Sequence, residues 1–199
     1  MSKKAAILRA ATQLLAVKGY KDASMAELAK ITGVAQGTIF YHYNNKEELF
    51  LAILKSFQED IVEEFSRFIR EHNFHSGLEM VEAVIDFYLH MASQMEERFM
   101  LLHRNHAYEL ARVNPTCHAY LEEIYNCMID IFEKAIVTGQ EDGSIRNTPA
   151  RRIAMIVFTM VDGLVRFHIH NLYDAGVLYD DVVHSCRTIL QNHVAPSRS

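Results

Sequence analysis

Apolar residues recur along this chain of 199 residues at intervals of three and four, the spacing that places side chains on one face of an α-helix. Only three prolines and eight glycines interrupt the pattern, and runs of β-branched residues are few. The chain is therefore predicted to be all-α, without internal repeats or low-complexity segments. About nine helices are expected, over about residues 3–18, 25–32, 35–41, 46–70, 78–95, 96–113, 116–137, 149–170 and 180–194.

Two of the predicted helices stand out. In the fourth, apolar positions continue without a break from Phe50 to Phe68, so it should hold about 25 residues and be roughly 37 Å long. The eighth contains IAMIVFTMV, which is apolar on every side, so we expect it to meet both the core and a second copy of the chain. With the ninth helix it should form a four-helix bundle across a two-fold axis. The interface residues expected are Ile153, Val157, Val161, Leu164, Val183, Arg187 and Leu190.

Two short helices near the N-terminus are joined by a turn at Gly33, which predicts a helix-turn-helix motif over about residues 24–43. Ser24 and Glu27 form a capping box at the start of the first short helix. The second contains Gly37, which suits a helix that something large must approach closely. We expect a three-helix head over residues 1–47, continuing into the fourth helix to about residue 61, and a body over residues 48–199.

In a helix-turn-helix, the second helix lies in the major groove of DNA and its exposed side chains read base edges. The amide of Gln36 can read adenine through two hydrogen bonds, and Thr38 offers a hydroxyl and a methyl group. Lys46, in the first turn of the next helix, is expected to hold a phosphate. The full set of expected DNA contacts is Ser24, Met25, Ala35, Gln36, Gly37, Thr38, Tyr41, His42 and Lys46.

The charge distribution favours the same partner. A formal net charge of −5 argues, by itself, against nucleic acid. However, residues 1–55 hold eight Lys and Arg against four acidic residues, whereas the rest of the chain holds twelve against twenty-one. A basic head on an acidic body indicates a polyanionic partner at one end.

The stretch AAILRAATQLLAVKGYKDASMAELAKITGVAQGTIFYHYNNKEELFLAIL resembles the TetR family of transcriptional regulators, most densely from about Ile7 to Leu54. Farther along, GQEDGSIR and VDGL are similar to weaker marks of the family's body. Tyr43 stands where the family often has Phe, and Asn44 and Asn45 replace commoner residues while leaving the helix cap intact.

The resemblance implies a homodimer that binds a palindromic operator on double-stranded DNA, with its two recognition helices about 34–36 Å apart. It also implies a small-molecule pocket in the body, whose ligand tilts the long fourth helix and commonly releases DNA, relieving repression. Three alternatives stay open. They are a metal- or haem-responsive regulator of the same fold, a regulator that needs a co-repressor, and a helix-turn-helix protein that acts through protein contacts.

Aromatic and methionine side chains are frequent in the body, so we expect an apolar or amphipathic effector. Most such residues fill a core, and any single one is more often a packing residue than a ligand contact. The polar groups that could orient the ligand are His103, His106, Tyr120 and Arg104. The expected effector contacts are Phe65, Tyr88, Met100, His103, His106, Tyr120, Tyr125, Met128 and Phe158.

Eleven histidines raise the question of a metal site. No histidine has a Glu three residues before it, and neither HExxH nor CxxC occurs, so we expect no metal and no cofactor. P-loop, GxGxxG and GxSxG motifs are also absent, and the neighbouring Asp86 and His90 lack a nucleophile. The sequence therefore predicts a protein that is not an enzyme.

The three cysteines, Cys117, Cys127 and Cys186, are scattered singly, as is typical of reduced thiols in a cytoplasmic protein. The sequence has no run of 18 apolar residues and no signal-peptide pattern. We therefore expect a cytoplasmic location and no membrane partner.

Overall fold

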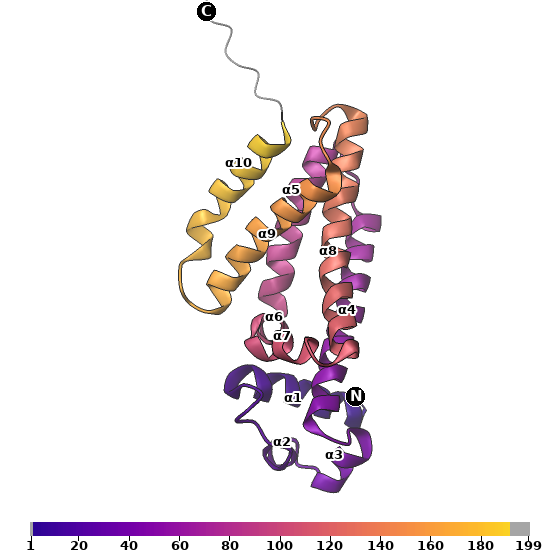
Figure 1. Ribbon diagram of the computed structural model, residues 1–199, viewed down its shortest axis with the longest axis vertical. Coiled ribbons are helices and arrows are strands. Elements are labelled where there is room, and N and C mark those ends of the chain that lie inside the picture. Colours follow the sequence, from indigo (N-terminus) through magenta and orange to yellow (C-terminus); the bar gives the residue numbers. More distant parts are fainter. Residues whose placement is uncertain (1, 192–199) are drawn as a thin grey trace, which may run out of the picture. The chain divides into compact units, whose positions relative to one another are not determined.

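The computed structural model describes residues 2–191, and for Ala175 the backbone alone. Within residues 2–191 the chain is helical and has no β-strand, which confirms the predicted all-α class (Figure 1). The helices are α1 (Lys3–Lys18), α2 (Met25–Thr32), α3 (Gln36–His42), α4 (Lys46–Glu71), α5 (Gly77–Gln94), α6 (Glu96–His103), α7 (Asn105–Ala111), α8 (Pro115–Asp142), α9 (Ala150–Ile169) and α10 (Tyr179–Leu190), with a 3₁₀ turn, η1 (Ala175–Leu178), before α10.

The predicted helix over residues 96–113 is two helices, so the described residues form ten α-helices rather than nine. The break lies at Arg104, whose ψ of 146° is extended rather than helical. Its guanidinium donates a hydrogen bond to the carbonyl oxygen of Ala16, in the last turn of α1 (2.6 Å). That carbonyl is one of those that a helix end leaves without a partner, and apolar spacing gives no signal of such a contact.

Residue contacts divide the chain into two compact units. The head unit comprises Met1–Val62 and Met95–Ile124, and the body unit comprises Glu63–Gln94 and Tyr125–Ser199. Helices α4 and α8 each contribute to both units, and α5 is followed by α6 after a single residue. The head unit thus includes α6, α7 and the first part of α8, which the sequence pattern did not assign to it.

In the head unit, α1 packs against α2 and α6. The buried side of α1 consists of positions that the apolar spacing selects, among them Ile7 and Leu15. Helix α2 contributes Leu28 and α3 contributes Ile39, both almost fully buried. Burying such a side chain stabilises the fold by roughly 1.5–3 kcal/mol, so single anchors can hold these two short helices in place.

Side-chain caps fix where the helices of the head unit begin. The Ser24 hydroxyl accepts a hydrogen bond from the Glu27 amide (3.1 Å), as the capping box predicts. The Glu27 carboxylate pairs instead with the Lys18 ammonium at 2.5 Å, which ties α2 to the end of α1. Asn45 Oδ1 accepts from the Glu48 amide (2.8 Å) and so starts α4.

In the body unit, α9 packs against α5 and α10, and α10 also packs against α5. Helix α5 begins close to the last turns of α8. A side chain at Gly77 would collide with the backbone of Gly139, so this approach requires glycine. The Gly77 amide also donates to the Asp142 carboxylate (2.6 Å), which fixes the start of α5.

Candidate DNA-binding surface and ligand pocket

The surface of the head unit that the sequence assigns to DNA is formed by α2, the turn after it and α3. Gly33 ends α2 with a φ of 66°, in the left-handed region that favours glycine. Leu28 and Ile39 anchor the two helices to the core. The opposite side of α3 faces solvent, as a helix that reads DNA requires.

The expected DNA contacts differ in how far they face solvent. Tyr41 projects farthest and is 85% exposed. Phe40 is 42% exposed and belongs to the same surface. Successive residues of a helix point about 100° apart, so with Ile39 fully buried Phe40 is directed to the side. Of the other expected contacts, Ser24, Ala35, Gln36 and Gly37 are exposed, and Met25, Thr38, His42 and Lys46 are half-buried.

Gly37 meets no internal requirement for glycine. It lies within α3 without a positive φ, and a methyl group added to it would have no atom within 4 Å. Alanine would fit this position and would favour the helix. The missing side chain therefore leaves room on the outer side of α3, where a partner can approach the backbone.

Lys46 does not have the position expected of a phosphate contact. Its ammonium donates to the carbonyl oxygens of Tyr20 and, at 2.8 Å, of Ala23, and lies 4.4 Å from the centre of the Tyr20 ring. A third carbonyl, that of Lys21, is 3.4 Å away. An ammonium has three N–H donors, so these carbonyls use its capacity. The expected role of this side chain is corrected: it fastens α4 to the turn between α1 and α2.

Helix α7 holds the same turn from another direction. The imidazole of His106 stacks on the ring of Tyr20, and the ring of Phe50 from α4 meets that imidazole edge-on. His106 Nε2 is buried and has no hydrogen-bond partner among the described residues. His106 was expected to orient an effector; the structure gives it a packing role in the head unit. No spacing in the sequence indicated this contact, because it joins helices far apart along the chain.

The nine residues expected to contact an effector are divided between the two units. Met100, His103, His106 and Tyr120 belong to the head unit, whereas Phe65, Tyr88, Tyr125, Met128 and Phe158 belong to the body unit. In the body unit, Phe158 meets the rings of Tyr88 and Tyr125 edge-on, with centroids 5.7 and 6.1 Å away. These three rings form one packed cluster.

A polar pair that the sequence analysis missed lies beside this cluster. The Tyr88 hydroxyl donates to the Asp162 carboxylate (2.7 Å), and Asp162 is only 6% exposed. Burial and the Asp162 carboxylate raise the pKa of Tyr88 well above its ordinary value. Arg166 Nε donates to the other oxygen of Asp162 (3.1 Å). A buried carboxylate is tolerated only when it is hydrogen-bonded and paired in this way, so these groups specify how α5 and α9 pack.

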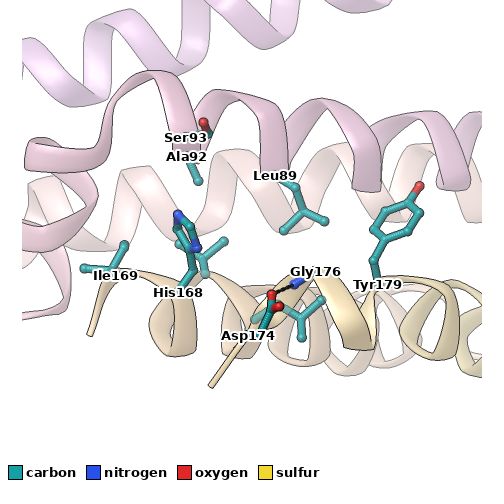
Figure 2. A pocket seen from close by; sticks show the side chains of 10 residues that line it. Leu89, Ala92, Ser93, His168, Ile169, Asp174, Gly176 and Tyr179 are labelled. Atoms are coloured by element: carbon teal, nitrogen blue, oxygen red, sulfur yellow. Dashed lines mark hydrogen bonds between the residues drawn. The ribbon is translucent and has the colours of Figure 1, made fainter. Parts of the chain in front are cut away.

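The body unit has a pocket of about 470 Å³ between α5, the C-terminal part of α9 and the segment that leads into α10 (Figure 2). Its volume lies within the range of small-molecule sites. None of the nine expected effector contacts lines it. The lining consists of Leu89, Ala92, Ser93, Leu164, Val165, His168, Ile169, Asp174, Gly176 and Tyr179. Five of these ten residues are aliphatic and two carry rings, whereas the sequence pattern had indicated aromatic and methionine side chains.

Several residues expected at a dimer interface are buried within their own chain. Val157 and Val161 are fully buried, so a second copy cannot reach them, and that expectation is wrong. The same holds for Leu164 and Leu190, which are 4% and 1% exposed. Ile153 and Val183 are half-buried, and the exposed Arg187 is paired with Glu82 (2.6 Å). The outward apolar residues of α9 are Met155 and Ile156, 50% and 47% exposed.

Three other observations bear on the chemistry of the chain. Among residues 2–191, no three His, Cys, Asp or Glu side chains gather as a metal site would require. Over the same residues, no helix combines the length and the hydropathy needed to span a membrane. Burial raises the pKa of all three cysteine thiols to about 11, so they are largely protonated at neutral pH.

The chain is similar to known regulators along most of its length. Residues 7–53 match the family model of bacterial regulatory proteins, tetR family. The fatty acid metabolism regulator protein of Bacillus subtilis is 25% identical over 186 residues, which cover 89% of this chain and 90% of that protein. The HTH-type transcriptional repressor BepR of Brucella suis is 23% identical over 199 residues, which cover 96% of this chain and 92% of BepR.

Solved structures share the fold. The transcriptional regulator FadR from Bacillus subtilis, in complex with stearoyl-CoA, has a TM-score of 0.75 and 22% identity, over 94% of this chain and 99% of that chain. A transcriptional regulator from Saccharomonospora viridis, in complex with choline, has a TM-score of 0.75 and 20% identity, over 93% of each chain. These similarities establish a common architecture around two very different ligands.

Proposed function

Because this chain belongs to the TetR family of bacterial transcriptional regulators, we propose that it is a homodimeric repressor that a small molecule releases from DNA. Helices α2 and α3 of each copy bind one half of a palindromic operator. The ligand occupies the body unit and favours a conformation that binds DNA poorly.

The observation that supports DNA reading most directly is the outward side of α3. Gln36, Gly37 and Tyr41 are exposed there, while Ile39 on the opposite side holds the helix to the core. Gln36 offers an amide for an adenine edge, and Tyr41 offers a phenol that suits a phosphate. Gly37 allows the helix backbone close to the groove. The amides of Lys46 and Glu47 at the start of α4, rather than the Lys46 side chain, are left for a phosphate, because the Glu48 amide is taken by Asn45.

We assign the dimer contact to the outward face of α9. Met155 and Ile156 are large, apolar and about half exposed within one chain. The neighbouring α10 packs beside α9 in the body unit, so the two helices can supply half of a four-helix bundle (Figure 1). A two-fold contact of this kind uses the same face on both copies.

The pocket of the body unit is the proposed effector site. Its lining comes from α5, α9, the segment before α10 and the first residue of α10, Tyr179. Helix α5 leads into α6, and Arg104 at the end of α6 donates a hydrogen bond to the Ala16 carbonyl of α1. Helices α4 and α8 each belong to both units. Movements of these helices can therefore reach the DNA-binding head along continuous chain. A ligand shifts the equilibrium only by the difference in its affinity for the two conformations.

Two structural relatives were crystallised with ligands of opposite charge, stearoyl-CoA and choline. The fold therefore does not decide the class of effector. In this chain, the class of effector depends on the residues that line its own pocket.

The function is tested by selecting bound sequences from random duplex DNA with the purified chain, at about 50 and 200 mM salt. We expect enrichment of a palindrome whose half-sites lie about one helical turn, 34–36 Å, apart. Gln36→Ala should relax preference at one base position of each half-site. Gln13→Ala, which removes an exposed glutamine from α1, is the matched control and should leave the selected sequence unchanged.

Weak, salt-sensitive binding without any enriched sequence would refute the proposed operator. The basic head would then be a surface that binds polyanions without regard to sequence. An enriched single site without two-fold symmetry would refute the homodimer while leaving sequence-specific binding in place.

A further inference from the structure

The pocket in the body unit has a directional arrangement of apolar and polar groups. Figure 2 shows Leu89 and Ala92 on the α5 side, His168 and Ile169 at one end and Tyr179 at the other. Leu164 and Val165 complete the apolar lining. Asp174 and Ser93 are exposed at the rim. A bound molecule would thus rest an apolar part on α5 and α9 and direct a polar part toward the rim.

Carboxylates are concentrated at the Tyr179 end and along the rim. Asp174 lines the pocket, and one of its oxygens accepts from the Gly176 amide (3.0 Å). The Tyr179 hydroxyl donates to Asp86 of α5, which places a second carboxylate, outside the lining itself, at the hydroxyl end of the ring. This hydrogen bond, followed by burial and the charges of Asp86, Asp180 and Glu82, raises the pKa of Tyr179 to about 12. The ring therefore stays neutral and lies in a field of negative charge.

Lysine and arginine side chains do not balance these carboxylates. The described lining contains no Lys or Arg, and α5 contains none along its whole length. Of the arginines on α9 and α10, Arg166 is paired with Asp162 and Arg187 with Glu82. Arg151 is paired with Asp130 and Glu133, and Arg152 precedes Leu164 by twelve residues, about 18 Å along the helix. His168 is the one base of the lining, at the end away from Tyr179.

We propose that this pocket binds an amphipathic organic cation, with its ammonium between Asp174 and the Tyr179–Asp86 pair and its apolar part on Leu89, Ala92 and Leu164. The inference rests on the proposed function, because it names the class of ligand that the effector site takes. A carboxylate attracts the ammonium directly, and an electron-rich ring beside it adds a cation–π contribution. A polyanionic headgroup would meet the same carboxylates without any arginine to hold its phosphates.

The test compares three probes with the same chain length: decyltrimethylammonium, decyl sulfate and decanol. Each is titrated into the full-length protein by calorimetry, below its micelle concentration. We expect the cation to bind the most tightly and the sulfate the most weakly, and the affinity for the cation to fall as salt rises. Ser93→Trp, which fills the rim with an indole in a chain that has no tryptophan, should abolish binding of the cation.

Two conservative variants test whether Asp174 and Asp86 attract the ammonium of the ligand. Asp174→Asn keeps an oxygen for the Gly176 amide, and Asp86→Asn keeps one for the Tyr179 hydroxyl, so both should fold. Each variant should lower the affinity for the cation about threefold, and the double variant about tenfold, as expected for partly exposed ion pairs. Asp181→Asn, an exposed acid of α10 outside the lining, is the matched control and should have no effect.

The outcomes separate this inference from the proposed function. Equal or tighter binding of decyl sulfate, or cation binding that survives Ser93→Trp, overturns the assignment of the pocket to a cation. Failure of all three probes to bind overturns it as well. If the protein binds operator DNA and a molecule of another class releases it, the proposed function stands. Cation binding that depends on Asp174 but leaves operator affinity unchanged would support the site and refute ligand-controlled release.

Discussion

The imidazole of His106 lies flat on the phenol ring of Tyr20, with their centroids 3.5 Å apart and their planes 15° from parallel. The same tyrosine offers its carbonyl and its ring to the Lys46 ammonium. Tyr20 thus joins α7, α4 and the turn that precedes the DNA-reading helices. Through this residue, the position of the turn depends on α7, a helix of the same head unit in which His106 lies 86 residues after Tyr20.

Acidification should loosen this junction. Burial lowers the pKa of His106, and Lys46 and Lys21 act in the same direction, against Glu109 and Glu47. The folded state therefore favours the neutral ring. Its contribution to stability is present above the unfolded pKa of about 6.5 and is lost as pH falls through the lower folded value. His106→Phe keeps the stack but cannot titrate, so its Tm should fall less than that of the wild type between pH 7 and 5. Parallel curves would contradict this.

Replacing Gly37 by alanine should separate stability from function. The methyl group has free space and favours the helix, so unfolding should cost about 0.5–1 kcal/mol more. The same methyl group should hinder the approach of DNA, and we expect operator affinity to fall at least several-fold. Thermal melts and a fluorescence-anisotropy titration would measure the two effects. Unchanged affinity would show that DNA does not approach α3 at this residue.

Lys46→Met should act mainly on the fold. It removes hydrogen bonds to the carbonyls of Tyr20 and Ala23 and leaves those acceptors unsatisfied, which should cost about 1–3 kcal/mol. The salt dependence of DNA binding should stay the same, because the ammonium is already engaged. Lys30→Met removes an exposed lysine from α2 and is the comparison, with little expected change in Tm. A salt slope that falls by about one for Lys46→Met would restore its phosphate role.

Replacement by phenylalanine should lower the free energy of unfolding more at Tyr88 than at Tyr179. Tyr88→Phe removes a hydrogen bond to a buried carboxylate and should lower the free energy of unfolding by about 1–3 kcal/mol. Tyr179→Phe removes a bond to the exposed Asp86 and should cost less than about 1 kcal/mol. Urea denaturation of both variants measures the difference. Comparable losses of unfolding free energy in the two variants would mean that the burial of Asp162 does not determine how much the hydrogen bond stabilises the fold.

Neighbouring residues of α9 should distinguish the subunit contact from the core. Ile156→Glu places a charge on the outward face and should give a folded monomer, seen by sedimentation and circular dichroism. Val157→Glu buries an unpaired charge, which costs several kcal/mol, and should unfold the chain or make it insoluble. A stable Ile156→Glu dimer would place the subunit contact on another face.

Local features of the sequence predicted the helices well. Ser24 and Asn45 are caps whose hydrogen bonds are made within three residues, and Gly33 ends α2 by its own conformation. Such signals depend only on near neighbours, so the chain displays them without a fold. Amphipathic spacing likewise placed Ile7 and Leu28 on buried faces.

Features set by distant contacts were not predictable in this way. The break at Arg104 and the engagement of Lys46 both depend on carbonyls elsewhere in the chain. In α9, apolar residues occupy every side, so periodicity could not decide that Val157 faces inward and Ile156 outward. The pocket was not predicted, because only two of its ten lining residues carry rings and part of its rim, including Asp174, lies between the last two expected helices.

The head unit is discontinuous along the chain, which affects how it can be assembled and exchanged. Its second part, Met95–Ile124, emerges from the ribosome after the intervening residues of the body unit. The helix-turn-helix motif therefore cannot reach its final packing during synthesis until α6 and α7 have followed. A hybrid regulator in which two such chains are joined at the middle of α4 would likewise pack α1 against the α6 of the other protein. Transfer of operator specificity between such proteins should succeed only when both segments are moved together.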